Sequence, residues 1–383
     1  MLLSARETAD RLGIKLDTLY AYVSRGLLRS VEVAESRERH YDADAIEHFL
    51  AGRGARGREP PRALVPVIGS AICLIENHRL YYRGEDALAL AERATLEDVA
   101  ALLWEEPAAA VAPQRHAGGE GRAGTQLGLV ERCQIRLAEL AAADLAALDL
   151  SRAGVARTGR SILGELAVCV AGVEPSPRPV HAQLAAAWRL GAPGADLVRR
   201  CLVLLADHEL NASTFVARCI ASTGATPYAA VSGALAALSG RRHGGASARV
   251  EALAGELAAG GDPVALMAAR LARDDALPGL GQPLYPEGDP RAAALLEAAK
   301  AAVPTRADWI DRVTQGAMQL TGERPNVDFG LGLAAAVLDL PRGAALGIFL
   351  VARSVGWIAH AIEQYESGVL IRPRARYTGK RPR

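Results

Sequence analysis

Four short polar segments interrupt a chain that is otherwise rich in alanine and leucine, and their side chains can transfer protons or hold anions. The first, residues 206–214 (ADHELNAST), contains Asp207, His208, Glu209 and Asn211 within an apolar helical stretch. A single histidine in such surroundings is more often a core residue whose hydrogen bonds are satisfied than a functional residue. This segment alone therefore leaves a structural and a functional interpretation open.

The second and third segments are rich in glycine and proline. Residues 240–246 (GRRHGGA) end a helix at Gly240, and the paired glycines let the backbone come close to a ligand beside His243. The alternative for this segment is an ordinary turn between two helices. Residues 278–292 (PGLGQPLYPEGDPRA) form a loop that returns to helix at Asp289, an N-cap residue followed by proline.

The fourth segment, residues 324–330 (RPNVDFG), precedes an apolar helix, and Asp328 taken alone is most simply predicted to be an N-cap residue. Arg353 follows in VARSVGWIAH, and Arg372 and Arg374 follow in LIRPRARYTG. The whole chain has 44 Lys and Arg against 43 Asp and Glu, a net charge of +1, so no overall field attracts an anionic partner. Any anion must be held by a local cluster.

The elements that position these groups are predicted to be mainly α-helices. The 383 residues are 50% hydrophobic and 23% charged, which is too apolar for a disordered chain. Only 4% are aromatic and β-branched runs are scarce, which argues against a sandwich or barrel. The five cysteines show no C-x-x-C or Cys/His spacing, so neither a disulfide framework nor a metal site is expected. Without an export signal or an apolar run of about 20 residues, we expect a cytoplasmic protein.

Residues 1–52 form a compact module whose sequence pattern differs from that of the rest of the chain. Ser4 and Glu7 are spaced as a capping box, and the helix that they begin ends at Gly13. A second helix is predicted over 16–23 after a short turn. Two short helices joined in this way are typical of a helix-turn-helix.

Two strands at 31–33 and 39–41 complete a winged module, with a third helix over 43–50. The module resembles the DNA-binding unit of the MerR and excisionase type. The resemblance implies contacts to DNA at the start of the second helix, from Lys15, Thr18 and Tyr20. Residues 1–62 have only 11 Lys and Arg against 10 Asp and Glu, so a docking or dimerisation module is the alternative.

A glycine- and proline-rich basic linker over 53–65 separates this module from the body of the chain, 66–383. The body begins with a predicted β-hairpin within 70–83 and continues as helices. A glycine-rich stretch over 112–125 is predicted to be a surface loop.

The four polar segments and the arginines after them occur in the order ADHELNAST, RRHGGA, GLG loop with DPRA, PNVDF, then ARSVGW and IRPRARYTG. This order resembles citrate synthase, over residues 64–379. The resemblance implies a large and a small helical domain, the small one spanning roughly 244–333, in an obligate homodimer. Citrate synthases with a leading helix-turn-helix form a recognisable subgroup.

The resemblance also implies a reaction. Acetyl-CoA, or a related acyl-CoA, would condense with oxaloacetate, or a related 2-keto acid, to give citrate or an analogue and CoA. Asp328 would remove a proton from the acyl methyl group, and His243 would donate a hydrogen bond to the enolate oxygen. Acyl-CoA would be a co-substrate, and no permanently bound cofactor is implied.

Substrate binding follows from the same resemblance. His208 would hold oxaloacetate, and three arginines would hold carboxylates through their planar forks: Arg291, Arg353 and Arg372. Arg372 would come from the neighbouring subunit. Arg241 and Arg242 could bind the phosphates of CoA, although a solvated turn is an alternative for this pair.

One position departs from the family pattern. Gln282 stands where citrate synthases have a histidine that polarises the ketone of oxaloacetate, and Pro283 replaces a basic residue common after it. A glutamine amide can donate a hydrogen bond but cannot pass on a proton, and losing a good donor costs on the order of 10² to 10³ in rate. A DNA-binding regulator or ligand sensor with a weakened synthase domain is therefore the alternative function.

Overall fold

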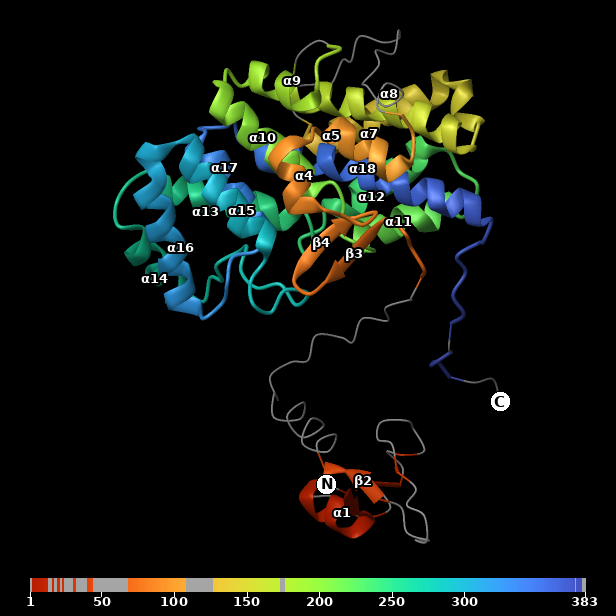
Figure 1. Cartoon of the computed structure of the whole chain (residues 1–383), viewed down its shortest axis with the longest axis vertical. Coiled ribbons are helices and arrows are strands. Elements are labelled where there is room, and N and C mark those ends of the chain that lie inside the picture. Colours follow the sequence, from red (N-terminus) through yellow and green to blue (C-terminus); the bar gives the residue numbers. More distant parts are fainter. Residues whose placement is uncertain are drawn as a thin grey trace. The chain divides into compact units, whose positions relative to one another are not determined.

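The computed structural model describes residues 2–12, 16, 19–20, 23, 30–31, 40–43, 68–107, 127–172, 176–375 and 377–380 (Figure 1). The chain divides into two compact units, Met1–Ile68 and Gly69–Arg383. The linker predicted over 53–65 and the surface loop predicted over 112–125 lie outside the described residues.

The N-terminal unit contains β1 (Leu2–Ser4), α1 (Ala5–Leu12) and β2 (His40–Asp42). The predicted capping box is confirmed, because the backbone N–H of Ser4 donates to Glu7 Oε2 at 2.8 Å and that of Glu7 donates to Ser4 Oγ at 3.3 Å. β1 and β2 pair in antiparallel register.

A bridge between Val31 and His40 lies where the sequence predicts the wing. The described positions of the range 16–23 are helical, and Tyr20 is 46% exposed. Lys15, Thr18 and nearly all of the predicted third helix lie outside the described residues.

The second unit begins with the predicted hairpin, which is confirmed. β3 (Cys73–Glu76) pairs with β4 (Arg79–Tyr82) in antiparallel register, and β5 (Glu85–Asp86) adds a short third strand. Asn77 and His78 form the turn with φ of 50° and 59°. Left-handed conformation at both central residues is what a two-residue hairpin turn of type I′ requires.

The rest of this unit is helical, as the composition predicts. Its helices are α4 (Ala87–Arg93), α5 (Leu96–Trp104), α7 (Leu129–Ala143), η1 (Leu145–Leu148), α8 (Arg152–Ala171), α9 (Val180–Ala187), α10 (Ala192–Leu205), α11 (Ala212–Ala221), α12 (Pro227–Leu238), α13 (Gly245–Ala258), α14 (Pro263–Leu271), α15 (Pro290–Ala302), η2 (Pro304–Arg306), α16 (Ala307–Thr321), α17 (Val327–Val337) and α18 (Ala344–Ser367).

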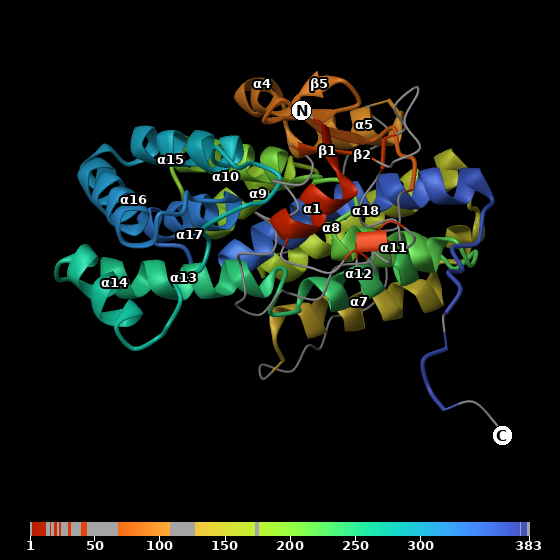
Figure 2. The same cartoon turned by 90° about the horizontal axis from the view of Figure 1, so that it is seen from below.

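Helix α18 runs through the middle of this unit, and α5, α8, α10, α11 and α12 pack around it (Figure 2). It is the one helix in the described part of the chain that is long and apolar enough to cross a membrane. However, 94% of its most apolar stretch is buried inside the unit. The side chain of Trp104 anchors α5 to it by donating from Nε1 to the carbonyl of Val355 at 2.9 Å. α18 is thus the central core helix of this fold.

Helices α13 to α17 gather at one side of α18, on the left in Figure 1. Within this group α13 and α15 pack on α17, and α14 packs on α16. The small domain predicted over roughly 244–333 falls within the group, and its boundaries stay a prediction.

The contact between α18 and the segment after α10 needs a glycine. The backbone N–H of Gly356 donates to the carbonyl of Ala206 at 3.1 Å. A Cβ at this position would lie 2.4 Å from Asp207 Oδ1 and 2.5 Å from the carbonyl oxygen of Ala206. The Ala206 oxygen is a backbone atom and the short Asp207 side chain is fully buried, so the two backbones would have to separate.

We therefore expect Gly356→Ala to lower the free energy of unfolding by about 1–3 kcal/mol, the usual cost of overpacking. Gly255→Ala is the matched control, because a Cβ at this position of α13 meets nothing within 4 Å. It should raise stability by about 0.4–1 kcal/mol. Urea denaturation of the three proteins measures both changes, and equal effects of the two substitutions would contradict the packing argument.

Candidate active site

His208 lies in the turn that joins α10 to α11. Asn211 caps α11 by accepting the backbone N–H of Thr214 at 3.2 Å, and Glu209 takes a left-handed conformation with φ of 51°. His208 Nε2 lies 3.2 Å from the hydroxyl of Tyr285. Burial, together with the positive charges nearby, lowers the pKa of His208 well below its usual range, so the imidazole is neutral.

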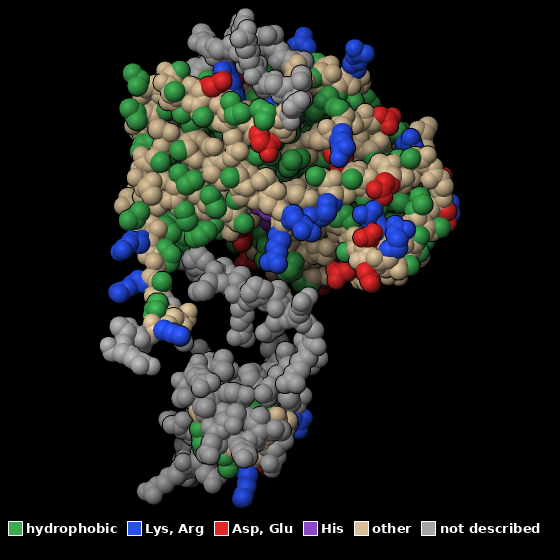
Figure 3. Space-filling model, turned by 180° about the vertical axis from the view of Figure 1, so that it is seen from behind, with side chains coloured by type: hydrophobic (Ala, Val, Ile, Leu, Met, Phe, Trp, Pro, Cys, Tyr) green, Lys and Arg blue, Asp and Glu red, His purple; other side chains and the backbone are tan. Residues whose placement is uncertain are grey.

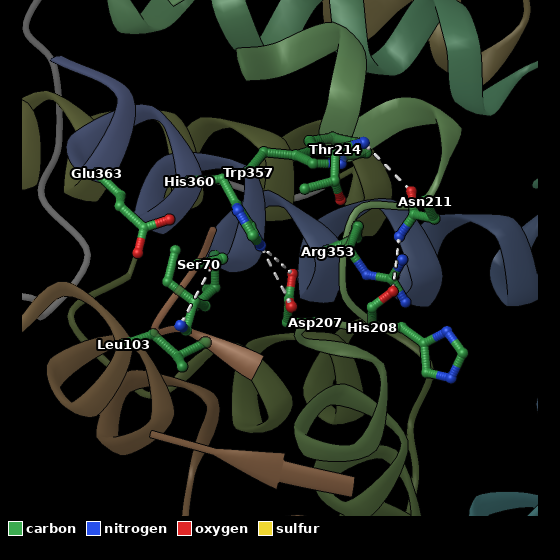
Figure 4. Close-up of polar contacts among 12 residues, drawn as sticks. Ser70, Leu103, Asp207, His208, Asn211, Thr214, Arg353, Trp357, His360 and Glu363 are labelled. Carbon is green, nitrogen blue, oxygen red and sulfur yellow. Dashed lines mark hydrogen bonds and ion pairs between the residues drawn. The ribbon is translucent and has the colours of Figure 1, made fainter. Parts of the chain in front are cut away.

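Arg353 reaches this turn from α18, where it is 2% exposed (Figure 4). Its Nε donates to the carbonyl of Leu205 at 2.8 Å, and its guanidinium lies 4.8 Å from the centre of the Phe349 ring. Burial lowers the pKa of Arg353 from its usual value. Among the described residues no carboxylate lies within ion-pair distance of it, so this buried cation can accept an anionic ligand.

Arg291 is held in the first turn of α15 by the residue before that helix. Its Nε and Nη2 donate to the two carboxylate oxygens of Asp289, at 3.0 and 2.7 Å. Asp289 also accepts the backbone N–H of Arg291, which confirms its predicted role as N-cap residue. Burial would lower the pKa of Arg291, but the ion pair outweighs burial and raises it.

The third nitrogen of Arg291, Nη1, is buried and has no hydrogen-bond partner. Its guanidinium also lies 5.5 Å from the centre of the Tyr285 ring, so the loop before α15 covers one side of it. A buried donor without a partner is costly. Nη1 is therefore available to a ligand oxygen.

His243 lies in the turn between α12 and α13. Its Nε2 is 2.7 Å from Ser213 Oγ, and its ring meets the Phe349 ring edge to face at 6.0 Å. Ser213 is held in turn by Trp357, whose Nε1 donates to Ser213 Oγ at 3.1 Å. Burial, followed by the charge of Arg353, lowers the pKa of His243 to about 4.

Asp328 is the second residue of α17, and its simplest predicted role as N-cap residue is wrong. Asn326 caps the helix, because its Oδ1 accepts the backbone N–H of Asp328 at 3.0 Å. The carboxylate of Asp328 is therefore free to accept the hydroxyl of Ser247. Burial raises the pKa of Asp328, which makes its carboxylate a stronger base than an ordinary aspartate.

The loop before α15 is tied to the segment that carries Asp328. Gly281 N–H donates to the carbonyl of Arg324 at 2.8 Å, and Asn326 donates to the carbonyls of Gly279 and Gly281 at 2.9 and 3.0 Å. Both glycines have positive φ, and a Cβ on Gly279 would lie 2.7 Å from the side chain of Val250. These contacts fix the position of Gln282, the next residue.

Gln282 lines a pocket of about 650 Å³ together with Tyr285 and Arg324. Its Oε1 accepts the backbone N–H of Leu284 at 3.4 Å. This contact uses the acceptor end of the amide, so the two N–H donors of Nε2 remain available to a ligand.

Three predicted residues are exposed, unlike the buried members of this group. Arg241 and Arg242 are exposed in the turn before His243, and the carbonyl of Arg241 accepts Arg249 Nη1 at 2.8 Å. Arg372 is exposed in the segment after α18, which has no regular structure within its described residues. Figure 3 shows one face of the molecule on which Lys and Arg side chains gather next to a small exposed area of a histidine side chain.

His208, Arg291, Arg353, His243 and Asp328 act on one another electrostatically. The charge of Arg353 lowers the pKa of both histidines, and the charges of Arg291 and Arg353 oppose the raised pKa of Asp328. Two buried guanidinium groups, two neutral imidazoles and one basic carboxylate can bind a dicarboxylate and remove a proton beside it. In the described part of the chain, no three His, Cys, Asp or Glu side chains gather as a metal site.

The sequence analysis missed the residues that hold these groups in place: Ser213, Ser247, Tyr285 and Trp357. Ser213 and Tyr285 lie inside the polar segments, so a search for hydrogen-bonding residues within those segments would have found them. Ser247 and Trp357 lie in helices, and only the packing of α13 and α18 brings them to the site.

Comparison with known proteins shows similarity to the citrate synthase family. The model of the family described as "Citrate synthase, C-terminal domain" matches residues 164–374, more than half of the chain. The putative citrate synthase 2 of Mycobacterium tuberculosis is 40% identical over 220 residues, 55% of this chain and 54% of that protein. The 2-methylcitrate synthase 1 of Corynebacterium glutamicum is 36% identical over 196 residues, 49% of this chain and 51% of that protein.

The crystal structure of citrate synthase from Thermotoga maritima is similar with a TM-score of 0.71 and 28% sequence identity. The similarity covers 84% of this chain and 96% of that chain. By sequence, the chain spans about half the length of the curated relatives that it matches.

The lowered pKa of His243 predicts a pH-dependent stability. Between pH values of about 6.5 and 4 the unfolded chain binds a proton on this residue and the folded chain does not, so stability is lost as the pH falls. His243 makes the free energy of unfolding fall by on the order of 3 kcal/mol as the pH goes from about 6.5 to 4, and His243→Gln should remove this fall. Urea denaturation at several pH values measures it. Because His208 is present in both proteins, parallel curves for wild type and variant would contradict the lowered pKa of His243.

Proposed function

Since this chain belongs to the citrate synthase family, we propose that it condenses an acyl-CoA with a 2-keto dicarboxylate. The substrates are acetyl-CoA or a close relative and oxaloacetate or a close relative, and the products are citrate or an analogue and CoA. The observation that carries this proposal is the pair of buried arginines, Arg291 and Arg353, beside the basic carboxylate of Asp328.

The keto acid binds first in this scheme, at the arginines. Arg291 offers the free donor Nη1, and Arg353 offers a guanidinium that has no carboxylate of the described residues within ion-pair distance. Neutral His208 donates a further hydrogen bond to the keto acid. A carboxylate of the keto acid supplies the acceptor that the buried Nη1 of Arg291 lacks.

The acyl group is then activated by Asp328 and His243. Asp328 takes a proton from the carbon next to the thioester, and the hydroxyl of Ser247 holds its carboxylate in place. Ser213 has one proton and two acceptors in reach, Asn211 Oδ1 at 2.8 Å and His243 Nε2 at 2.7 Å. When Ser213 donates to His243 Nε2, the neutral ring carries its hydrogen on Nδ1 and can donate it to the enolate oxygen.

Gln282 takes the place of the histidine that the family resemblance assigns to the keto carbonyl. The free N–H groups of its amide donate a hydrogen bond to that oxygen as negative charge develops. Because the amide is uncharged and transfers no proton, we expect a slower reaction than with an imidazole.

Several parts of the proposal extend beyond this group of residues. Arg372 completes the site of the second subunit in a homodimer, and light scattering can test whether the protein is a dimer. Arg241 and Arg242 bind the phosphates of CoA. Acyl-CoA acts as a co-substrate, without a permanently bound cofactor. The helices of roughly 244–333 close over the substrates as a small domain.

A second candidate function rests on Gln282. If the synthase reaction is lost, the arginine site would still bind a dicarboxylate or CoA ester, and the chain would act as a ligand sensor. DNA binding by the N-terminal unit, through residues such as Tyr20, would belong to that function. The two experiments below separate the candidates.

A thiol-release assay with acetyl-CoA and propionyl-CoA, each against a panel of 2-keto acids, tests the enzyme. We expect CoA release from wild type, and a loss of about 10² to 10⁴ in rate for Asp328→Asn with keto acid binding nearly unchanged. Asp308→Asn is the matched control, since Asp308 is an exposed acid in the first turn of α16. More than about a tenth of the wild-type rate in Asp328→Asn would exclude its role as base.

Gln282→His distinguishes the enzyme from the sensor. If weak polarisation of the keto carbonyl limits the rate, turnover should rise by about tenfold or more, and the affinity for oxaloacetate should change less. Gln315→His, on the exposed side of α16, is the control. If neither the wild type nor Gln282→His forms citrate, the result favours the sensor. A wild-type rate that the added histidine lowers would mean that the site is adapted to glutamine.

A further inference from the structure

A chain of buried polar side chains continues from Arg353 along α18, away from the keto acid site (Figure 4). Arg353, Gly356 and His360 follow one another at spacings of three and four residues, so they share one face of the helix. This face packs against the segment Ala206–His208, through the bond from Gly356 to Ala206 and the contact of His360 with Asp207.

His360 and Asp207 are both fully buried. His360 Nε2 lies 3.4 Å from each carboxylate oxygen of Asp207. On the other side of the ring, His360 Nδ1 lies 3.3 Å from Arg218 Nη1. A guanidinium has only donors, so Nδ1 must accept, and the hydrogen of the neutral ring must be on Nε2, where it donates to Asp207.

Arg218 is fixed on both of its edges. Its Nε donates to Gln364 Oε1 at 2.9 Å, and its Nη1 donates to Glu363 Oε2 at 2.5 Å. Glu363 in turn accepts the backbone N–H of Ala71 at 2.8 Å. The orientation of the His360 ring is therefore set from outside the substrate site.

Asp207 is the next anion in this chain of contacts, and it lies one residue before His208. Its Oδ1 is buried without a hydrogen-bond partner, and its Oδ2 accepts from His360. The side chain of Cys73 also interacts with this carboxylate. A buried carboxylate is costly unless an opposite charge is near. Arg353, which has no carboxylate in ion-pair distance, supplies that charge, and the charge of Asp207 in turn opposes the effect of burial on the pKa of Arg353.

We infer that His360 is a positioning residue for the proposed reaction. By fixing the carboxylate of Asp207, it keeps Arg353 charged and oriented and holds the backbone that carries His208. His360 touches no substrate, and Arg218 fixes its tautomer. This inference rests on the proposed function, because it concerns binding of the keto acid.

Kinetics of two His360 variants test the inference. His360→Leu removes the donor to Asp207, and the KM for oxaloacetate should rise by about tenfold or more with a smaller change in the KM for acetyl-CoA. His360→Gln places an amide N–H near the former Nε2 and should restore the KM to within about threefold of wild type. Ser354→Ala is the matched control, since it removes a buried hydrogen bond to Val351 from the same helix without touching this chain of contacts.

An unchanged KM for oxaloacetate in folded His360→Leu overturns the positioning role, as does a failure of His360→Gln to restore it when Ser354→Ala behaves as wild type. ¹⁵N NMR of the histidine rings in the wild-type protein at pH 8 tests the arrangement without any variant. We expect the hydrogen of His360 on Nε2, and a hydrogen on Nδ1 overturns the inference. Absence of turnover in wild type contradicts the proposed function instead, and the NMR signature then decides the arrangement of His360.

Discussion

The burial of two guanidinium groups in a helical core is the constraint on which the rest of this structure depends. Arg291 and Arg353 are 1% and 2% exposed, and a charge in such a place needs partners. Arg291 has Asp289, which makes two hydrogen bonds to it. Arg353 has a carbonyl, an aromatic face and the more distant Asp207. The two arginines thus differ in their partners: Arg291 keeps one buried donor, Nη1, without a partner, and no carboxylate of the described residues lies within ion-pair distance of Arg353. These donors bind the dicarboxylate in the proposed reaction.

Helix α18 connects this charge to the fold. It carries Arg353 to the site, Trp357 to Ser213 and His360 to Asp207, so one rigid element orients groups from two other segments. Its burial on almost all sides means that no solvent competes for these hydrogen bonds. Gly356 completes the arrangement, because the absence of a side chain lets the turn after α10 lie directly on the helix.

The proposed acid and base groups, in contrast, come from turns and helix starts. His243 follows α12, Asp328 lies in the first turn of α17, and Gln282 lies in a loop whose glycines adopt positive φ. Helix starts hold such residues well because the capping residue is separate from the reactive one, as Asn326 is from Asp328. A rigid binding site on α18 is thus combined with reactive groups on segments that belong to the neighbouring helices.

The sequence by itself determined the helical class, the hairpin and the caps at Ser4 and Asp289, and it singled out the segments that hold the proposed reactive residues. Each of these depends on local spacing and on conformational preferences, which a chain expresses wherever it is. It did not determine that Asn326 rather than Asp328 caps α17, that Arg353 lacks a carboxylate partner, or that His360 contacts Asp207, 153 residues earlier. Such contacts depend on how α18 packs against the turn after α10. Only the tertiary structure brings those groups together and removes the water between them, so only the tertiary structure sets their protonation states.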